Sequence, residues 1–482
     1  MEQKEQVGIT VKKSEDFNEW YNQVVIKADL IDYSLVSGCI ILKPNSYEIW
    51  EKIQKIFDGK IKQSGHRNCY FPMFIPESLL KKEAKHVEGF TPEVAWVTHA
   101  GNSELNERLA IRPTSETLMY ESYSKWIRSW RDLPVLLNQW NSVVRWEFKH
   151  PKPFLRTREF LWQEGHTAHA TKEDAEKEVM QQLFEYADLI ENYMAIPVVA
   201  GKKTENEKFA GADYTAAVES LMPDGKALQM GTSHMLGQNF SKPFGIKFLD
   251  KDEKEKFVWQ TSWGLSTRTI GAVIMMHGDD KGLVIPPKIA PIQAVVVPIV
   301  FKGKSENIIE SAREAVKRLK DKNYSVELDD RDGYTPGWKF NEWEMKGIPL
   351  RIEIGPRDVE AEQLVLVRRD TSEKITVKSK DLEKKFAETL GLIQDNLLKN
   401  AKEHLEKNTV EVKSFEELTS AIKNKKMAKA MFCSETECEL AIKEKADGAT
   451  CRCIPFEQKP AKGKCVQCHK DAKCWALFAK AY

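Results

Sequence analysis

Two short segments bring cationic, anionic and aromatic side chains together in the chain. In the run Val-Arg-Trp-Glu that ends at Glu147, a strand would place Arg145 and Glu147 on one face. A cation beside an anion can hold a zwitterion or a phosphate, although a surface ion pair between strands gives the same pattern. The second segment presents four side chains on one face at the same period: Phe160, Trp162, Glu164 and His166. Because a core strand would not bury two ionisable groups in this way, the two segments predict a polar site.

A third segment places glycine, hydroxyl side chains and a cation where a strand passes into a helix. It runs from Thr261 through Gly264 to Arg268, and an apolar helix over Ala272–Met276 follows. Backbone N–H groups at such a helix start can bind phosphate, and Arg268 adds positive charge. A helix cap would explain the same residues, so this segment alone does not establish a phosphate site.

Seven of the nine cysteines lie in the C-terminal part of the chain. Since the charged N-terminus does not look like a secretory signal, the cluster predicts metal binding rather than disulfides. Two closely spaced pairs provide four thiolates, enough for a tetrahedral structural Zn²⁺: Cys433, Cys438, Cys465 and Cys468. Cys451 and Cys453 form a competing pair, whose one-residue spacer chelates less easily. Cys474 is expected to pack in a core.

Composition sets the class of protein. The 482 residues are 41% hydrophobic and 30% charged, values that exclude a disordered or collagen-like chain and allow several domains. The 73 basic and 72 acidic residues nearly balance, which excludes a polycation; residues 401–482 lean only mildly basic. The longest apolar run, from Ile292 to Phe301, is too short for the roughly 18–20 residues of a membrane span. We therefore expect a soluble cytoplasmic protein with no membrane partner.

The elements that must position these residues fall into three parts, 1–285, 286–400 and 401–482. The first part is predicted to contain a helix over 47–56, a kinked strand over 68–75, strands over 140–149 and 158–169, and a helix over 172–194 capped by Thr171. After the proline-rich boundary at 285–291, strands over 293–297, 324–328, 349–354 and 363–367 with a helix over 306–320 predict a small α/β domain. A charged helix over 382–406 leads into the cysteine-rich module.

Together the three chemical segments resemble the signature motifs of class II aminoacyl-tRNA synthetases. The helix and strand ending at Pro72 resemble motif 1, the hairpin with Arg145 and Glu147 motif 2, and the strand–helix with Gly264 and Arg268 motif 3. Further runs narrow the resemblance to prolyl-tRNA synthetases of the archaeal and eukaryotic type: Arg112-Pro-Thr-Ser-Glu116, Trp162-Gln-Glu-Gly-His-Thr-Ala-His169, Phe209-Ala-Gly-Ala-Asp213, Leu228-Gln-Met-Gly-Thr-Ser-His234 and Pro336-Gly-Trp-Lys-Phe340. The resemblance covers nearly the whole chain.

The resemblance implies a fold and an activity. The fold is an α+β catalytic domain, with an antiparallel sheet of six or seven strands flanked by helices, followed by an α/β anticodon-binding domain and the zinc module. The activity is ATP-dependent attachment of L-proline to tRNA through a prolyl-adenylate, with Mg²⁺, in a homodimer. The alternative is a non-catalytic, synthetase-like tRNA-binding or regulatory protein. The motif residues are all present, which argues against it; a threonine enzyme would need other residues at Thr114, Glu116 and His234.

The resemblance also implies roles for individual residues. Arg145, Glu147 and Arg268 are the catalytic group. Proline would be bound by Thr114, Glu116, Arg145, Trp162, His166, Phe209 and His234. ATP would be bound by Arg145, Glu147, Arg156, Thr157, Phe160, Gln229, Thr232, Ser266 and Arg268. In the small domain, Arg351 and Arg357 would read guanine edges and Glu344 would accept from a guanine N–H, unless these three form a salt-bridged strand face.

Overall fold

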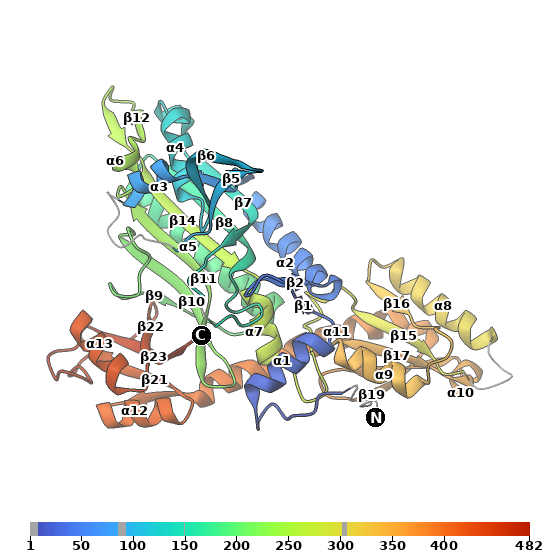
Figure 1. Ribbon diagram of the computed structural model, residues 1–482. Coiled ribbons are helices and arrows are strands. Elements are labelled where there is room, and N and C mark those ends of the chain that lie inside the picture. Colours follow the sequence, from blue (N-terminus) through green and yellow to red (C-terminus); the bar gives the residue numbers. More distant parts are fainter. Residues whose placement is uncertain (1–7, 85–92, 149, 301–305) are drawn as a thin grey trace.

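The computed structural model describes residues 8–84, 93–148, 150–300 and 306–482. Within these ranges, eleven strands form one large sheet at the centre of the molecule (Figure 1). In spatial order they are β20 (Thr409–Val412), β21 (Met427–Phe432), β23 (Cys474–Ala481), β22 (Thr450–Pro455), β9 (Val199–Lys202), β10 (Tyr214–Leu221), β11 (Lys226–Gly237), β14 (Trp259–Ser266), β8 (Glu159–His169), β7 (Val135–Val144) and β3 (Arg67–Asn68). No helix in the described ranges is both long and apolar enough to cross a membrane.

The part of this sheet from β9 to β7 is antiparallel throughout, as expected, and β3 joins its edge in parallel. The sequence did not indicate that the cysteine-rich module would continue the same sheet. Strand β22 pairs with β9, where Ile454 lies opposite Lys202, and the end of β23 lies parallel to the start of β11. The last residue, Tyr482, packs back onto the first part, and its hydroxyl donates to Asp224 over 2.6 Å.

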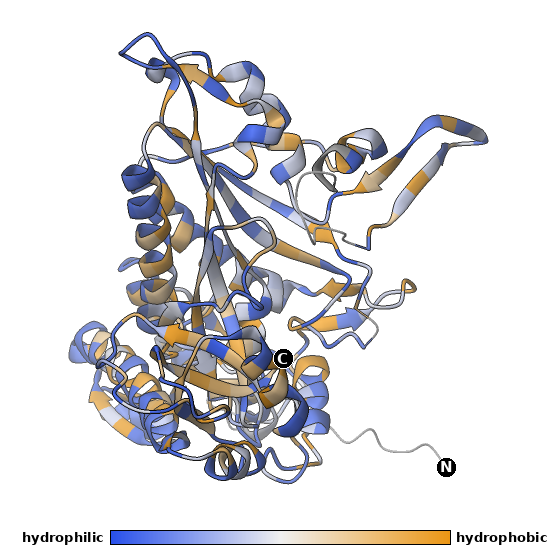
Figure 2. Ribbon diagram, turned by 90° about the vertical axis from the view of Figure 1, so that its left-hand side faces the viewer, coloured by the Kyte–Doolittle hydropathy of each residue, from blue (hydrophilic) through white to orange (hydrophobic). Residues whose placement is uncertain are grey.

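Helices cover the sheet: α2 (Pro44–Gln63), α5 (Lys172–Asp188) and α7 (Arg268–His277). Helices α2 and α5 each bury one face, as helices packed on a core do, whereas α7 is buried along almost its whole length. Figure 2 shows hydrophilic and hydrophobic residues alternating along helices at the surface. In that core Phe57 of α2 stacks on Tyr186 of α5 at 5.0 Å between ring centroids, and Tyr186 meets Trp263 of β14 at 6.4 Å. Thr171 caps α5 as predicted, but the α-helix ends at Asp188, and a π-helical turn η2 (Leu189–Tyr193) completes the predicted length.

The predicted kinked strand over 68–75 is wrong as a single element. Its start belongs to β3, while its end belongs to β4 (Phe74–Pro76), which pairs with β6 (Ser103–Ile111) in a separate sheet that also contains β5 (Trp96–Ala100). Pro72 lacks the N–H that would continue the ladder, so the pairing breaks there. The preceding N–H, of Phe71, donates instead to the side chain of Gln139.

The motif 2 hairpin also differs from expectation. Strand β7 begins at Val135 and ends at Val144, so Arg145 and Glu147 follow the strand instead of sharing its face. The hairpin pairing still reaches Arg145, whose N–H donates to the Arg158 carbonyl over 2.7 Å. The remaining elements of residues 8–285 are α1 (Phe17–Lys27), β1 (Ile31–Tyr33), β2 (Ile40–Leu42), α3 (Glu77–Ala84), α4 (Glu116–Trp126), η1 (Trp130–Asp132), α6 (Ser241–Phe244), β12 (Lys247–Leu249) and β13 (Glu255–Phe257).

The predicted small α/β unit is present beside the catalytic part, with its own apolar core (Figure 1). Its sheet order is β16 (Val326–Leu328), β15 (Ala294–Pro298), β17 (Leu350–Ile354), β18 (Gln363–Arg368) and β19 (Lys374–Lys378). Its helices are α8 (Glu306–Lys320), α9 (Pro336–Met345), α10 (Pro356–Glu360), η3 (Ser379–Asp381) and α11 (Leu382–Asn408). Strand β19 and helix α9 were not predicted. In the last module, α12 (Phe415–Lys423) and α13 (Thr436–Lys445) accompany its strands.

The pairing of β8 with β14 depends on a glycine. Gly165 lies opposite Trp263, and a Cβ added at Gly165 would come within 2.1 Å of the Trp263 ring. We expect Gly165→Ala to destabilise the protein by about 1–3 kcal/mol, because the indole cannot move out of a close-packed core. Thermal unfolding measures the effect. The control is Gly59→Ala within α2, where nothing lies within 4 Å of the added Cβ and a slight stabilisation is expected. Equal thermal unfolding midpoints for Gly165→Ala and Gly59→Ala would contradict the role of Gly165 in packing against Trp263.

Candidate active site

A cavity of about 680 Å³ opens on β8, β11 and β14. The strand register sets its floor: Trp162 lies opposite Ser266, Gly264 lies between Glu164 and Thr232, and His234 lies opposite Ser262. Most of the residues predicted for proline and ATP line this one cavity: Thr114, Glu116, Arg145, Glu147, Phe160, Trp162, His166, Phe209, Gln229, Thr232, His234, Ser266 and Arg268. The three chemical segments therefore meet, although the chain separates them widely.

Two guanidinium groups supply positive charge to the cavity. The Nε of Arg145 donates to the Pro113 carbonyl over 3.1 Å, and its guanidinium lies 5.4 Å from the ring centroids of both Phe160 and Trp162. Arg268 donates to the carbonyls of Leu155 and Gln229, each over 3.3 Å. Burial, reinforced by Arg145, lowers the pKa of Arg268 to about 10, so the group stays charged at neutral pH. These hydrogen bonds orient the cations through neutral carbonyls, which leaves their charge available to an anionic substrate.

A buried carboxylate organises the centre of the cavity. Glu164 accepts hydrogen bonds from the Ser115 N–H over 3.1 Å and from Asn141 over 2.7 Å, and it lies 3.0 Å from His166 Nε2. Although burial opposes ionisation, His166 and these hydrogen bonds hold the pKa of Glu164 below its usual value. The pKa of His166 is raised: burial opposes the charged form, but Glu116 and Glu164 outweigh it. The pair therefore behaves as a fixed dipole that orients the ring of His166.

The opposite wall combines an aromatic ring with a neutral histidine. Phe209 and His234 lie 4.7 Å apart between ring centroids, and His234 Nδ1 lies 2.9 Å from the Thr215 hydroxyl. Burial, together with repulsion from His166 and Arg145, lowers the pKa of His234 to about 3, so this imidazole is neutral at physiological pH. Nearby, the hydroxyl of Thr114 donates to the buried carboxylate of Glu116. The cavity thus offers an apolar wall beside a carboxylate–hydroxyl pair.

Two predicted ATP residues do not line the cavity. Arg156 is exposed, with its guanidinium 5.2 Å from the Phe148 ring centroid, and the Thr157 hydroxyl donates to the Glu159 carbonyl over 2.7 Å. Conversely, several lining residues were not in the predicted set: Glu93, Glu164, Glu207, Lys208, Thr215, Gly231 and Ser262. The period-two pattern of β8 had already placed Glu164 on the right face. The others carry no comparable signal in the sequence.

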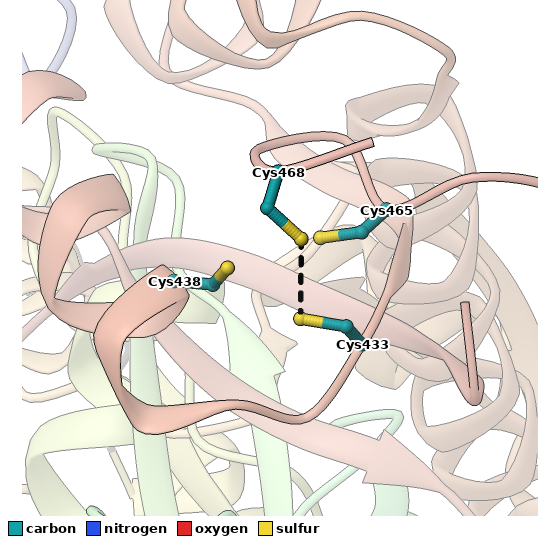
Figure 3. A group of neighbouring side chains, drawn as sticks. All are labelled: Cys433, Cys438, Cys465 and Cys468. Carbon is teal, nitrogen blue, oxygen red and sulfur yellow. Dashed lines mark hydrogen bonds between the residues drawn. The ribbon is translucent and has the colours of Figure 1, made fainter. Parts of the chain in front are cut away.

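The four cysteines of the predicted zinc set come together. Cys433 follows β21, Cys438 lies on α13, and Cys465 and Cys468 come from the loop before β23; their sulfurs all lie within 4.8 Å of one another (Figure 3). The Sγ atoms of Cys433 and Cys468 are 3.7 Å apart, close to the edge of about 3.8 Å that a tetrahedron with Zn–S bonds of about 2.3 Å requires.

The other C-terminal cysteines lie outside this group. Cys451 and Cys453 are buried on β22, and Cys474 is buried near Phe432, as its predicted packing role requires. None of the nine cysteines, all of which lie within the described residues, forms a disulfide.

The three predicted anticodon residues do not form one surface. Arg351 is buried on β17, where it donates to Glu353 over 2.9 and 3.0 Å and to Glu344 over 3.1 Å, so the salt-bridged strand face is present. Glu344 also lies 3.7 Å from Lys281. Arg357, by contrast, is exposed on the short helix α10.

Three family models match separate parts of the chain: "tRNA synthetase class II core domain (G, H, P, S and T)" over residues 96–277, "Anticodon binding domain" over 293–389 and "Prolyl-tRNA synthetase, C-terminal" over 415–482. Proline–tRNA ligase from Natranaerobius thermophilus is 56% identical over 98% of this chain and 97% of its own length. Proline–tRNA ligase 2 from Clostridioides difficile is 52% identical over 100% of this chain and 99% of its own.

A solved structure agrees with these relatives. The prolyl-tRNA synthetase of Cryptosporidium parvum, crystallised with halofuginone and AMPPNP, aligns with a TM-score of 0.96 and 48% identity over 100% of this chain and 99% of that one. The cavity, the two domains that follow it and these likenesses over nearly the full length lead to one conclusion. The chain belongs to the proline–tRNA ligases, class II aminoacyl-tRNA synthetases that attach proline to tRNA.

Proposed function

We propose that the cavity on β8, β11 and β14 binds L-proline and ATP side by side and joins them as prolyl-adenylate. The observation that carries this proposal is the pairing, in one cavity, of two guanidinium groups oriented by carbonyls with the carboxylate–hydroxyl pair of Glu116 and Thr114. The first pair suits the phosphates and the proline carboxylate. The second suits the two N–H donors of a secondary ammonium.

The proposed mechanism needs no covalent enzyme intermediate. The proline carboxylate attacks the α-phosphorus of ATP in line, the bond to the leaving pyrophosphate breaks, and the tRNA 3′ hydroxyl then takes the prolyl group from AMP. Arg145 faces the reacting carboxylate and α-phosphate, and Arg268 holds the nucleotide with Phe160, Gln229 and Thr232. The protein contributes alignment and charge compensation.

Mg²⁺ bound with the ATP triphosphate would supply positive charge that offsets the charge of the leaving pyrophosphate. Among the proposed site residues, Glu147 offers a carboxylate on the exposed side of the cavity. Arg156 and Thr157, which lie on the motif 2 loop outside the cavity, would reach ATP only if that loop closes over it.

The proline ring would lie against the apolar wall, which Trp162, Phe209 and His234 provide. Because His234 is neutral, it does not repel the prolyl ammonium, whereas Glu116 and the Glu164–His166 pair draw that charge to one end of the pocket. Proline differs from larger amino acids by its compact ring, so shape excludes them.

The remaining proposals concern assembly and location. We propose a homodimer, because residues of the motif 1 segment and the end of α4 expose large apolar side chains: Tyr70, Met73, Phe74 and Trp126. The cytoplasm is the proposed location, since charged tRNA serves translation there. We also keep the division at 285 and 400, although α11 runs through the second boundary.

We propose that the small α/β domain binds the anticodon, and that the four-cysteine group holds a structural Zn²⁺. Arg357 is a proposed guanine reader, and its exposed side chain is accessible to an RNA base. Arg351 and Glu344 would act as a pair, because the buried Glu353 already orients the guanidinium of Arg351. The zinc would be held by Cys433, Cys438, Cys465 and Cys468, whose closed set of four thiolates leaves no position for a reacting water.

Arg145→Ala is expected to lower proline-dependent ATP–pyrophosphate exchange by about 10²–10³-fold or more, because charge at the α-phosphate is needed most in the transition state. Exchange on purified protein measures this. Arg145→Lys keeps the positive charge but loses the bidentate geometry of the guanidinium. Its exchange rate should lie between those of the wild type and Arg145→Ala. The control, Arg313→Ala, removes an exposed arginine that pairs with Asp330 in the other domain. An Arg145→Ala enzyme within about threefold of wild type would refute the assignment.

Arg357→Ala should leave exchange unchanged and weaken tRNA charging by about 1–3 kcal/mol in kcat/KM, because exchange does not involve tRNA. The two assays are run on the same preparation, again with Arg313→Ala as the matched exposed arginine. Equal losses in both assays would argue against an anticodon role. Arg351→Ala is a less direct test, since it also removes an ion-pair partner of the buried Glu353, which among the described residues then pairs with Lys374 alone.

The protein should contain about one Zn²⁺ per chain, as elemental analysis measures. Cys468→Ser is expected to lower the zinc content and the thermal midpoint together, because metal binding contributes to the stability of the module. Cys474→Ser, a buried cysteine outside the group, should keep the metal. Protein purified without chelators that holds no zinc, or equal zinc content in the two variants, would contradict the site.

A further inference from the structure

A buried charged cluster joins the C-terminal module to the catalytic part. It consists of Lys203, which follows β9, Glu219 on β10 and Arg452 on β22, with exposed fractions of 2%, 1% and 5%. The first two belong to the catalytic part and the third to the module. The cluster lies where β22 extends the catalytic sheet, next to the pairing of Ile454 with Lys202.

Hydrogen bonds satisfy this cluster almost completely. Arg452 reaches both oxygens of Glu219, with Nη2 at 3.1 and 3.2 Å and Nε at 3.3 Å, and its Nη1 donates to the Thr450 hydroxyl over 2.9 Å. The Lys203 ammonium donates to Glu219 over 2.5 Å and to the carbonyl of Arg452 over 2.7 Å. The lysine therefore contacts the module through the Arg452 carbonyl, and its ion pair with Glu219 ties that contact to β10 of the catalytic part.

Stability alone does not account for such a cluster. Transferring three charges out of water costs several kcal/mol per ion before their attraction offsets it, and apolar residues of similar volume often serve as well. A buried ionic cluster does, however, fix geometry, because its hydrogen bonds are satisfied in one arrangement only. What it fixes here is the start of the segment that follows Lys203.

That segment runs directly into the proposed proline pocket. Residues Glu207, Lys208 and Phe209 line the cavity. Hydrogen bonds to Thr215 hold both ends of the 203–209 segment. The N–H of Lys203 donates to the Thr215 carbonyl over 2.8 Å, and the N–H of Phe209 donates to the Thr215 hydroxyl over 2.9 Å.

The Thr215 hydroxyl continues the connection to the pocket wall. It also lies 2.9 Å from Nδ1 of His234, the imidazole that faces Phe209. Contiguous contacts therefore lead from Arg452 through Glu219 and Lys203 to the wall against which proline is proposed to lie.

We propose that Arg452 is a positioning residue for proline binding, acting from the C-terminal module. Through Glu219 and Lys203 it holds the 203–209 segment in the arrangement that places Phe209 and His234 against the proline ring. The proposal rests on the proposed place of proline in the cavity. In this proposal the C-terminal module helps to hold the wall of the proline pocket in place, although Arg452 itself does not contact the substrate.

The test measures KM for proline and for ATP separately, by exchange, in wild type and in Arg452→Met. We expect KM for proline to rise about tenfold or more, with KM for ATP changed less than about threefold. A merely structural loss would reduce the amount of active enzyme, and hence kcat, without moving KM for proline. Arg452→Lys retains the charge and should recover part of the affinity for proline.

Two further variants sharpen the test. Arg318→Met removes a matched arginine that pairs with Glu383 in the α/β domain, through two bonds of 2.8 Å, and should leave both KM values unchanged. Glu219→Gln should raise KM for proline as Arg452→Met does, and the double variant should add little, because both act through one cluster. If Arg452→Met does not fold, the comparison of Arg452→Lys with wild type carries the test.

An unchanged KM for proline in folded Arg452→Met, or in folded Arg452→Lys where the methionine variant does not fold, would overturn the proposal. So would an equal rise in KM for ATP, because it would show that the effect does not act through the 203–209 segment. The wild-type protein tests the proposed function independently. If it catalyses proline-dependent exchange but Arg452→Met leaves KM for proline unchanged, the proposed function stands and only the role of Arg452 is refuted.

Discussion

Trp263 fills the space that Gly165 leaves on the neighbouring strand, and the register of the catalytic sheet depends on this contact. With Trp263 opposite Gly165, the adjacent pairs place Glu164 beside Gly264 and His166 beside Ser262 on the cavity face. A shift of one residue would turn each of these side chains to the opposite face of the sheet. Glu164 could then no longer meet Ser115 and Asn141.

Charge in the cavity is arranged for a substrate that carries both signs. The guanidinium groups of Arg145 and Arg268 donate hydrogen bonds to backbone carbonyl oxygens, which orient them in the cavity. The carboxylates of Glu116 and Glu164 lie within 4.8 Å of each other and of His166, whose pKa they raise, whereas burial keeps His234 neutral. Because these groups are fixed before substrate arrives, little reorganisation is needed when charge develops during adenylate formation.

The C-terminal module is continuous with the catalytic part through main-chain pairing as well as through side chains. Strand β22 extends the sheet at β9, β23 touches β11, and Tyr482 contacts Asp224. The buried ion cluster of Lys203, Glu219 and Arg452 lies at this junction. A module joined to the catalytic sheet in this way can support a pocket wall without contributing a group to the chemistry.

Local sequence determined the elements and most of the chemistry. Three patterns span only a few residues each: the period-two face of 160–166, the glycine–hydroxyl run before Arg268 and the cysteine pairs. They can be recognised without knowledge of tertiary contacts. In the structure, the first two contribute residues to one cavity and the cysteine pairs form one group. Amphipathic spacing likewise located the middle of α2, because burying one face of a helix imposes its period, and the cap at Thr171 located the start of α5. The resemblance to prolyl-tRNA synthetases supplied the residue roles, which periodicity could not.

Tertiary structure decided what depends on distant partners. Whether Arg351 is free or salt-bridged depends on how α9 packs beside β17, because Glu344 comes from α9 while Glu353 lies two residues away on the same strand. Whether Arg156 lines the cavity depends on the course of a loop. The break at Pro72 shows the same limit: a missing N–H predicts a kink, but not that the two halves join different sheets. The joining of the module to the catalytic sheet has no local signature at all, because an edge strand gains its partner only when the whole chain has folded.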